Sequence, residues 1–293
     1  MTTRATRTPV LLLSLAAGFI LIWLIAAAFP FFWTVLGSFK VEQDFFSYVG
    51  WMDTVTARNT IAQTGDAWTT DAYEDVWIGE SFWRPAVNTL IVTFAVTFIS
   101  LAFGTLGGYA LARSGQRYAF WILLAAMVFR AMPGVTLVSG YLLPFFQWNL
   151  WGHLPTAIIV LVALNQPFTL WMMYSFFQGI PRDLDESALV DGCTRFQAFR
   201  LAIMPVMWPG VITTGLFSFL LAYNDFSVSG LILTERNQTM VPKIASYLGK
   251  IQSDGNIMFA VAAVVSVTVP IFLLVMFFQR YLVSGLTAGA VKG

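Results

Sequence analysis

Six stretches of this chain are long and apolar enough to cross a lipid bilayer, and they constrain the fold more than any other feature. A spanning helix needs about 20 mostly apolar residues, because backbone polar groups in the hydrocarbon must be hydrogen-bonded within the segment. The composition agrees: 58% of the 293 residues are hydrophobic and 11% are charged, against about 25% charged in soluble domains. We predict an all-α integral membrane protein, a single domain over 1–293 with six transmembrane helices. The predicted spans are 10–36, 85–112, 119–146, 154–179, 206–233 and 257–281.

The distribution of lysine and arginine between the loops predicts the orientation of the chain. The side that holds both termini, 113–118 and 180–204 carries nine of the 16 cations in short segments, and the other side carries six in longer loops. We therefore expect both termini in the cytoplasm and the loops 37–84 and 234–256 outside it. Loop 37–84 is long enough for one or two short helices but not for an independent core.

Several classes of function are excluded by composition. A net charge of +1 leaves no basic footprint for nucleic acid. One cysteine and one histidine exclude a disulfide framework and argue against a metal site or a catalytic triad. The chain has no Gly-x-x-x-x-Gly-Lys-[Ser/Thr] loop, so it is not expected to bind ATP in that manner. We predict a non-catalytic chain without metal or other cofactor, whose energy comes from a separate subunit.

A polar segment, 181–210, separates the fourth and fifth predicted spans. Pro181 and the acids that follow it suit the first turn of a helix, whose positive end favours negative charge. Gly192 is a natural helix stop, and the capping-box pattern of 194–197 predicts a second helix. Pro205 is expected to end the regular pattern. Two short helices that meet at a glycine form a compact knob that can transmit a push. The alternative is an amphipathic loop lying on the bilayer.

The same segment resembles a known family motif. The run Glu-Ser-Ala-Leu-Val-Asp-Gly-Cys at 186–193, with Pro205 twelve residues later, resembles the EAA loop of permease subunits in ABC importers. Ser187 and Cys193 each replace an alanine of the usual pattern. The Gly-Tyr-Ala-Leu-Ala-Arg run at 108–113 and the C-terminal sequence from 279 also resemble maltose-type permeases of the MalG kind. The resemblance covers essentially the whole chain.

The resemblance implies a type I ABC importer permease in a bacterial inner membrane that imports a carbohydrate, or a related polyol or oligosaccharide. The implied partners are a second MalF-like permease, two ATPase subunits that hold ATP and Mg, and a periplasmic or lipid-anchored binding protein. The loop 180–204 would form a coupling helix seated in the ATPase. By motif position the ATPase-coupling residues would be Glu186, Ser187, Ala188, Asp191, Gly192, Phe196 and Pro205. An outer loop would contact the binding protein through Ser253, Asp254, Gly255 and Asn256.

Polar groups within the third and fifth spans mark a candidate translocation path. A charge inside the membrane is costly and usually faces a cavity or a partner. The candidate residues are Arg130, Tyr223, Asn224, Asp225 and Ser227. Helix–helix hydrogen bonding without substrate contact is the alternative. The sequence also leaves open whether Arg130 pairs with Asp225 or with the partner subunit.

Two other functions remain open. An ABC permease for glycerol phosphate or a polyamine would share this fold, and an anionic solute would favour cations in the path, for which Arg130 alone is thin support. A stand-alone secondary transporter would need repeated broken helices, which the sequence does not show. On packing, we expect Gly104 and Gly108 to form a close helix contact and Pro167 to interrupt the fourth span.

Overall fold

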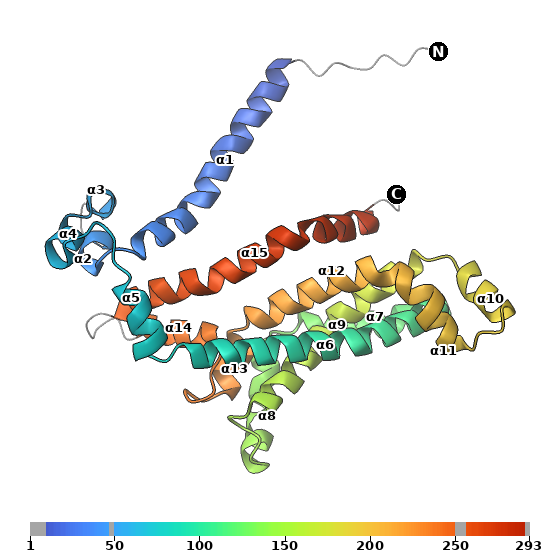
Figure 1. The fold of residues 1–293 in the computed structure, drawn as a ribbon. Coiled ribbons are helices and arrows are strands. Elements are labelled where there is room, and N and C mark those ends of the chain that lie inside the picture. The colour runs from blue at the N-terminus through green and yellow to red at the C-terminus, as the bar shows by residue number, and fades with distance from the viewer. Residues whose placement is uncertain (1–9, 47–49, 250–255, 291–293) are drawn as a thin grey trace. The chain divides into compact units, whose positions relative to one another are not determined.

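The structure, a computed structural model, describes residues 10–46, 50–249 and 256–290. All regular structure in these ranges is helical, which confirms the all-α prediction. Five helical stretches are long and apolar enough to cross a membrane, and a bent pair makes a sixth if it counts as one span. The elements (Figure 1) are α1 (Val10–Gly37), α2 (Glu42–Phe45), α3 (Gly50–Thr56), α4 (Arg58–Thr64), α5 (Asp71–Glu74), the π-helical turn η1 (Asp75–Gly79), α6 (Trp83–Arg113), α7 (Gln116–Ala131), α8 (Gly134–Gln147), α9 (Leu154–Gln178), α10 (Asp183–Val190), α11 (Arg195–Ala198), the π-helical turn η2 (Phe199–Ile203), α12 (Met204–Tyr223), α13 (Ser227–Ile232), α14 (Met240–Gly249) and α15 (Asn256–Ala290).

The chain divides into two compact units, one of 1–80 with 247–266 and one of 81–246 with 267–293. In the first unit, the stretch predicted to hold one or two short helices contains four, α2 to α5, and the turn η1. Its small core, Ala72 with Met258 and Ala262, includes residues of α15. The stretch therefore takes part of its core from a distant segment, which explains how so short a loop is ordered.

The second unit is built on three helices, α6, α9 and α12, which pack against one another (Figure 1). A Cβ atom added at Gly104 would lie 2.5 Å from the Thr169 side chain of α9, and one at Gly108 would lie 2.7 Å from Met173. Only residues without side chains allow this approach, so the packing role predicted for the two glycines is confirmed. Pro167 lies inside α9, and the helix continues through it rather than being interrupted.

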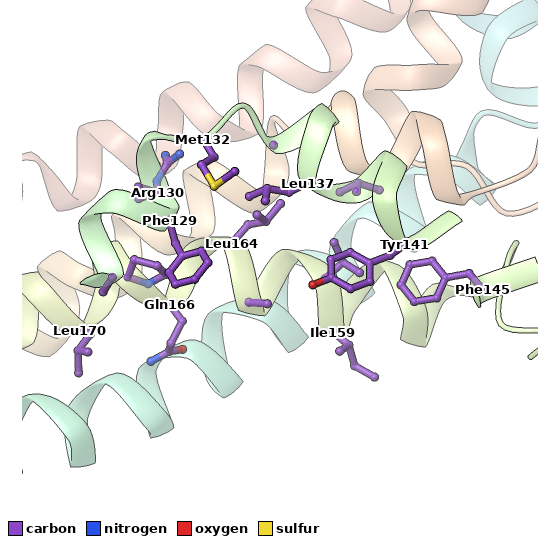
Figure 2. Close-up of a pocket in the computed structure, with 16 residues that line it drawn as sticks. Phe129, Arg130, Met132, Leu137, Tyr141, Phe145, Ile159, Leu164, Gln166 and Leu170 are labelled. Carbon is purple, nitrogen blue, oxygen red and sulfur yellow. The ribbon is translucent and has the colours of Figure 1, made fainter. Parts of the chain in front are cut away.

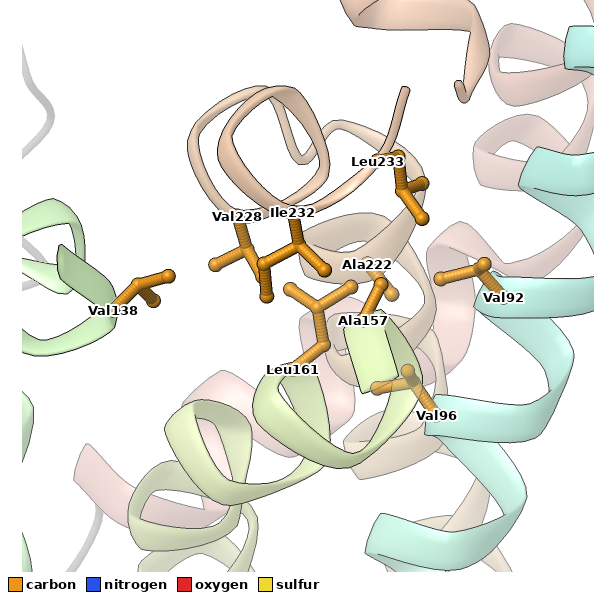
Figure 3. Packing of buried hydrophobic residues seen from close by; sticks show 9 residues of the cluster. All are labelled: Val92, Val96, Val138, Ala157, Leu161, Ala222, Val228, Ile232 and Leu233. Carbon is orange, nitrogen blue, oxygen red and sulfur yellow. The ribbon is translucent and has the colours of Figure 1, made fainter. Parts of the chain in front are cut away.

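A buried hydrophobic cluster joins this bundle to α8 and α13 (Figure 3). It includes Val96 of α6, Leu161 of α9, Val138 of α8 and Ile232 of α13, all of them buried. The cluster positions the short helices α8 and α13 against the long ones. Both of these short helices follow a break in a predicted span.

The helices of the third and fifth predicted spans are each interrupted in the structure. Between α7 and α8 the axis bends by 85° at Met132 and Pro133. A proline disfavours helical backbone in the residue before it and cannot donate to the preceding turn, so the helix ends there. The fifth span ends at Tyr223 and resumes at Ser227 as α13. Asp225 accepts hydrogen bonds from the α13 backbone at Val228 (3.3 Å) and Ser229 (2.8 Å), which stabilises the restart.

Candidate functional site

The polar segment folds into a helical hairpin, defined here as residues 180–204, whose two turns are closed by local hydrogen bonds. Gly192 has φ +86°, a left-handed conformation that favours glycine. Its N–H donates to the carbonyl of Leu189 (3.1 Å), and that of Cys193 donates to Ala188 (3.0 Å), which is the Schellman ending of α10. At the start of α11, Thr194 and Gln197 form a capping box, as predicted. The conformation of the hairpin is therefore determined by residues within the hairpin itself.

Two prolines of the polar segment 181–210 differ from the predictions. Helix α10 begins at Asp183, two residues after Pro181. Pro205 does not end the second helix, because α11 continues through η2 into α12 and Pro205 lies in the first turn of α12. A π-helical turn widens the backbone just before a residue that cannot donate, so the chain stays helical across the proline.

The inner side of the hairpin is held by a partly buried ion pair. Arg113, the last residue of α6, donates through Nε to Asp185 Oδ2 (2.8 Å), and its Nη2 lies 2.7 Å from the same oxygen. Tyr109 donates its hydroxyl to the other carboxylate oxygen of Asp185. The Tyr109 ring also packs against Phe177 and Phe199, at centroid distances of 5.4 and 4.8 Å. Asp185 was not among the predicted site residues; its position one residue before the EAA-like run was the available signal.

The outer side of the hairpin is exposed and carries most of the predicted coupling residues. Ala188 is buried against the rest of the unit. Val190 is 88% exposed and Phe196 is 66% exposed, although both are large and apolar. Large apolar side chains exposed beside acids on one hairpin favour a docking role. The other predicted coupling residues are likewise exposed: Glu186, Ser187, Asp191, Gly192 and Pro205.

Four polar residues line one cavity at the breaks in the third and fifth spans. The cavity has a volume of about 180 Å³, and its polar lining residues are Arg130, Asn165, Asp225 and Ser227. Although Arg130 and Asp225 line the same cavity, these two described residues form no ion pair with each other. The arrangement brings together an acid, a base, an amide and a hydroxyl, which can bind several hydroxyl groups of one solute.

Asn165 was read in the sequence only as part of a helix interruption, yet its side chain is the most unusual of the four. It is 6% exposed, and both its amide nitrogen and its amide oxygen lack a hydrogen-bond partner among the described residues. Such orphaned groups are rare in folded proteins and call for a functional reason or a bound water. A polar residue beside a proline within an apolar span was the signal in the sequence.

Tyr223 and Asn224 do not line this cavity. The Tyr223 hydroxyl is buried and donates to the Val267 carbonyl of α15 (3.1 Å). The Asn224 amide donates to the Leu220 carbonyl of its own helix (2.9 Å). The Tyr223 bond joins two helices, whereas the exposed Asn224 side chain bonds only within its own helix.

A second, larger cavity of about 560 Å³ lies beside the bend between α7 and α8 (Figure 2). Its wall is mainly apolar and aromatic, with Phe129, Tyr141 and Phe145 among its residues, and Arg130 and Gln166 supply polar groups. Arg130 thus lines both cavities. The cavity is lined by residues of α7, α8 and α9 on both sides of the bend.

The remaining predicted site residues are those of the expected binding-protein contact. Ser253, Asp254 and Gly255 lie outside the described residues, and Asn256 is the first residue of α15. Within the described ranges, no three His, Cys, Asp or Glu side chains are grouped as a metal site would require.

Comparisons with known proteins identify the family of the chain. Residues 104–288 match the family described as "binding-protein-dependent transport system inner membrane component". The chain is 30% identical over 275 residues to the trehalose/maltose transport system permease protein MalG of Thermococcus litoralis. The aligned region covers 92% of this chain and 93% of that one. It is 31% identical over 233 residues to the trehalose transport system permease protein SugB of Mycobacterium tuberculosis, with 77% and 82% covered.

The fold has a counterpart among solved structures. A chain of a bacterial ABC transporter involved in the import of the acidic polysaccharide alginate superposes with a TM-score of 0.72, at 18% identity, over 96% of this chain and 99% of that one. The family match covers more than half of the sequence. The EAA-like hairpin and the helices from α7 to α14 lie in the matched part. The chain therefore belongs to the family of inner membrane components of binding-protein-dependent transport systems.

Proposed function

We propose that this chain is a permease subunit of an ATP-driven carbohydrate importer and that its hairpin is the docking element for an ATPase subunit in the cytoplasm. The observation that carries the proposal is the two-sided hairpin: Asp185 faces inward to Arg113, while Val190 and Phe196 are exposed on the outside. A helix fixed on one side and apolar on the other is suited to seat in a partner's groove. The chain itself is a transport component, and ATP and Mg would be held by the ATPase.

The names of the relatives support a carbohydrate as the solute. Relatives are named for trehalose or maltose, for diacetylchitobiose and for sulfoquinovosyl glycerol. The cavity with Arg130, Asp225, Ser227 and Asn165 supplies donors and acceptors for hydroxyl groups, and we propose it as part of the translocation path. Tyr223 and Asn224 do not enter the proposed path, because carbonyls of α15 and α12 engage them.

We propose a heteromeric assembly with a second permease, two ATPase subunits and a solute-binding protein, with both termini of this chain in the cytoplasm. The loop around 250–256 would contact the binding protein. Deletion of three or four residues there should abolish uptake and docking of the binding protein; unchanged docking would contradict this assignment.

Copurification tests the main proposal. The tagged chain is extracted gently from native membranes, and the copurifying proteins are identified for the unsubstituted chain, Glu186→Lys and Gly192→Pro. We expect an ATPase subunit and a second permease with the unsubstituted chain, and loss of the ATPase alone in both variants. Asp183→Asn, an exposed acid of the same helix, is the control and should keep the ATPase. A chain that purifies alone, and transports without an ATPase, would favour the secondary-transporter alternative.

A further inference from the structure

The ends of α6 and α9 and the start of α10 meet at one polar joint, defined here as Tyr109, Arg113, Gln178, Arg182 and Asp185. Besides its contacts with Asp185, Arg113 donates through Nη1 to the carbonyls of Phe177 and Ile180, each at 3.3 Å. Phe177 lies in the last turn of α9 and Ile180 two residues after its end; the Phe177 carbonyl also accepts the Ile180 N–H (3.2 Å), so Arg113 adds a second donor there. One guanidinium therefore connects three helices.

The joint is reciprocal. The carbonyl of Ala112, at the end of α6, accepts hydrogen bonds from Gln178 and from Arg182, each at 3.4 Å. Helix α6 therefore donates hydrogen bonds to Asp185 of the hairpin through Arg113. It accepts hydrogen bonds from Gln178 and Arg182 through the Ala112 carbonyl. Two opposed sets of hydrogen bonds resist both separation and sliding of the two elements.

A hydrophobic cluster lies beneath the polar joint and stiffens it. Ala112, Phe177, Phe199 and Ile203 are all buried in one cluster drawn from α6, α9 and η2. Packed clusters transmit displacement because they have little free volume to absorb it. The Arg113 and Asp185 side chains remain only 17% and 14% exposed, so solvent screens their attraction weakly.

We propose that Arg113 and Asp185 are positioning residues that join the hairpin to α6, so that a displacement of α10 by the ATPase is passed to the second span. The inference rests on the proposed function, because it assigns how movement of the docking element reaches the membrane. Neither residue needs to touch the ATPase or the solute, and the docking face of the hairpin is separate from the joint.

Three variants separate charge, geometry and pairing. Asp185→Asn removes the negative charge but keeps an acceptor oxygen for Tyr109 and Arg113. Arg113→Lys keeps the positive charge but loses the planar fork that reaches Asp185 and the α9 carbonyls together. The exchange Arg113→Asp with Asp185→Arg restores an ion pair in reverse. Asp183→Asn is the matched control, since Asp183 lies on the same helix and is exposed.

Access to the polar cavity reports whether the second span follows the ATPase. In a Cys193→Ser background, which removes the single cysteine, Ser227→Cys places one thiol in the cavity lining. Complexes copurified from native membranes are reconstituted in proteoliposomes and labelled with a membrane-impermeant maleimide. Labelling is compared without nucleotide and after trapping with ATP, Mg and orthovanadate. ATP hydrolysis and the amount of copurified ATPase are measured on the same samples.

We expect trapping to change the labelling rate by about tenfold in the reporter chain and in the Asp183→Asn control. In Asp185→Asn and Arg113→Lys the change should fall to within about twofold, while the ATPase still copurifies and hydrolyses ATP. The exchange variant should recover part of the response.

Three results would overturn or redirect the inference. An unchanged labelling response in both single variants would show that the joint does not pass on the movement, and the proposed function would stand. Loss of the ATPase from every joint variant, including the exchange, would show that the pair only shapes the docking face. Failure of the reporter chain itself to bind an ATPase or to respond to trapping would instead contradict the proposed function.

Discussion

Gly192 is the residue on which the hairpin depends most directly. Its φ of +86° is strained for any L-residue, whereas a Cβ at this position would meet no atom within 4 Å. The cost of a substitution is therefore conformational rather than steric. This separates Gly192 from Gly104 and Gly108, where a side chain would collide with α9.

Gly192→Ala should destabilise the hairpin by about 1–2 kcal/mol, the usual penalty for left-handed backbone in a residue with a Cβ. Limited proteolysis of the hairpin in detergent should detect the change as faster cleavage. Gly115→Ala is the control, because Gly115 has φ −65° and only an ordinary contact with Tyr118 at 3.7 Å. Equal cleavage of the two variants would contradict a conformational role for Gly192.

Asn165→Leu should raise the thermal stability of the chain while lowering solute uptake. Removing an unpartnered buried amide relieves a desolvation cost of about 1–3 kcal/mol. The same change removes a polar group from the proposed path. Thermal unfolding in detergent and uptake in proteoliposomes measure the two effects. As a contrast, Thr169→Val should lower stability, because its hydroxyl bonds with Ser218 (3.1 Å) and the Asn165 carbonyl (3.2 Å). An Asn165→Leu chain with lower stability would indicate a well-bound water at the amide.

The short helices of the first unit are organised around one buried carboxylate. Asp44 accepts hydrogen bonds from the backbone and side chain of Asn59 (2.9 and 2.8 Å) and of Thr60 (2.7 and 2.6 Å). Burial by itself raises the pKa of Asp44, but the hydrogen bonds from Thr60 and Asn59 outweigh it, and the pKa is lowered from its ordinary value.

Because the folded state lowers the pKa of Asp44, its stabilising effect is complete above the ordinary aspartate pKa and is lost as the pH falls through the folded-state value. Proteolysis of the 37–84 stretch should therefore accelerate on acidification below about pH 4. Asp44→Asn should destabilise the stretch at neutral pH and flatten this dependence. Glu42→Gln, an exposed acid in the same helix, should keep the profile of the unsubstituted chain. An identical acid profile in Asp44→Asn would contradict the assignment.

The bend between α7 and α8 depends on Pro133, so Pro133→Ala should straighten the third span. Spin labels at positions 124 and 143 should move apart toward about 28 Å, the length of 19 residues in a continuous helix. Straightening should also close the cavity beside Phe129 and Tyr141. Pro144→Ala is the control, because Pro144 lies within α8 without ending it. An unchanged distance in Pro133→Ala would show that the core cluster around Val138, not the proline, holds the bend.

Much of the fold followed from the sequence because membrane spans are set by length and apolar composition. Local signals also predicted the hairpin, since Gly192 and the Thr194 capping box act over a few residues. The breaks at Pro133 and Asp225 were missed because the apolar runs continue on both sides of them. The Arg113–Asp185 pair joins residues 72 apart, and hydrophobic periodicity carries no information about such a contact. The cavity residues were found in part, since a charge in a span is visible in the sequence but its neighbours are not.

Many large apolar side chains are exposed along the described helices. The side chains of α1 illustrate this: Phe19, Ile22 and Phe32 are each more than 65% exposed. Lipid covers part of such a surface, and partner subunits are expected to cover more.

Assembly should therefore raise the thermal stability of this chain. A partner at 100 times its dissociation constant stabilises the folded state by about 2.7 kcal/mol. The unfolding temperature of the tagged chain should be higher within the copurified complex than alone in the same detergent. Glu186→Lys should lose the part of this increase in unfolding temperature that the ATPase contributes. It should keep the part that the second permease contributes. Equal unfolding temperatures for the free chain and the complex would contradict stable assembly.

The bent third span also changes what the surrounding lipid must do. Helices α7 and α8 have 16 and 14 residues, and so are about 24 and 21 Å long, while the hydrocarbon core is about 30 Å thick. Neither helix alone matches that thickness, and the other spans do. Where a helix is shorter than the hydrocarbon core, the bilayer beside it must thin, at a cost that grows with the hydrophobic mismatch. A host membrane with longer acyl chains should therefore disfavour this pair of short helices.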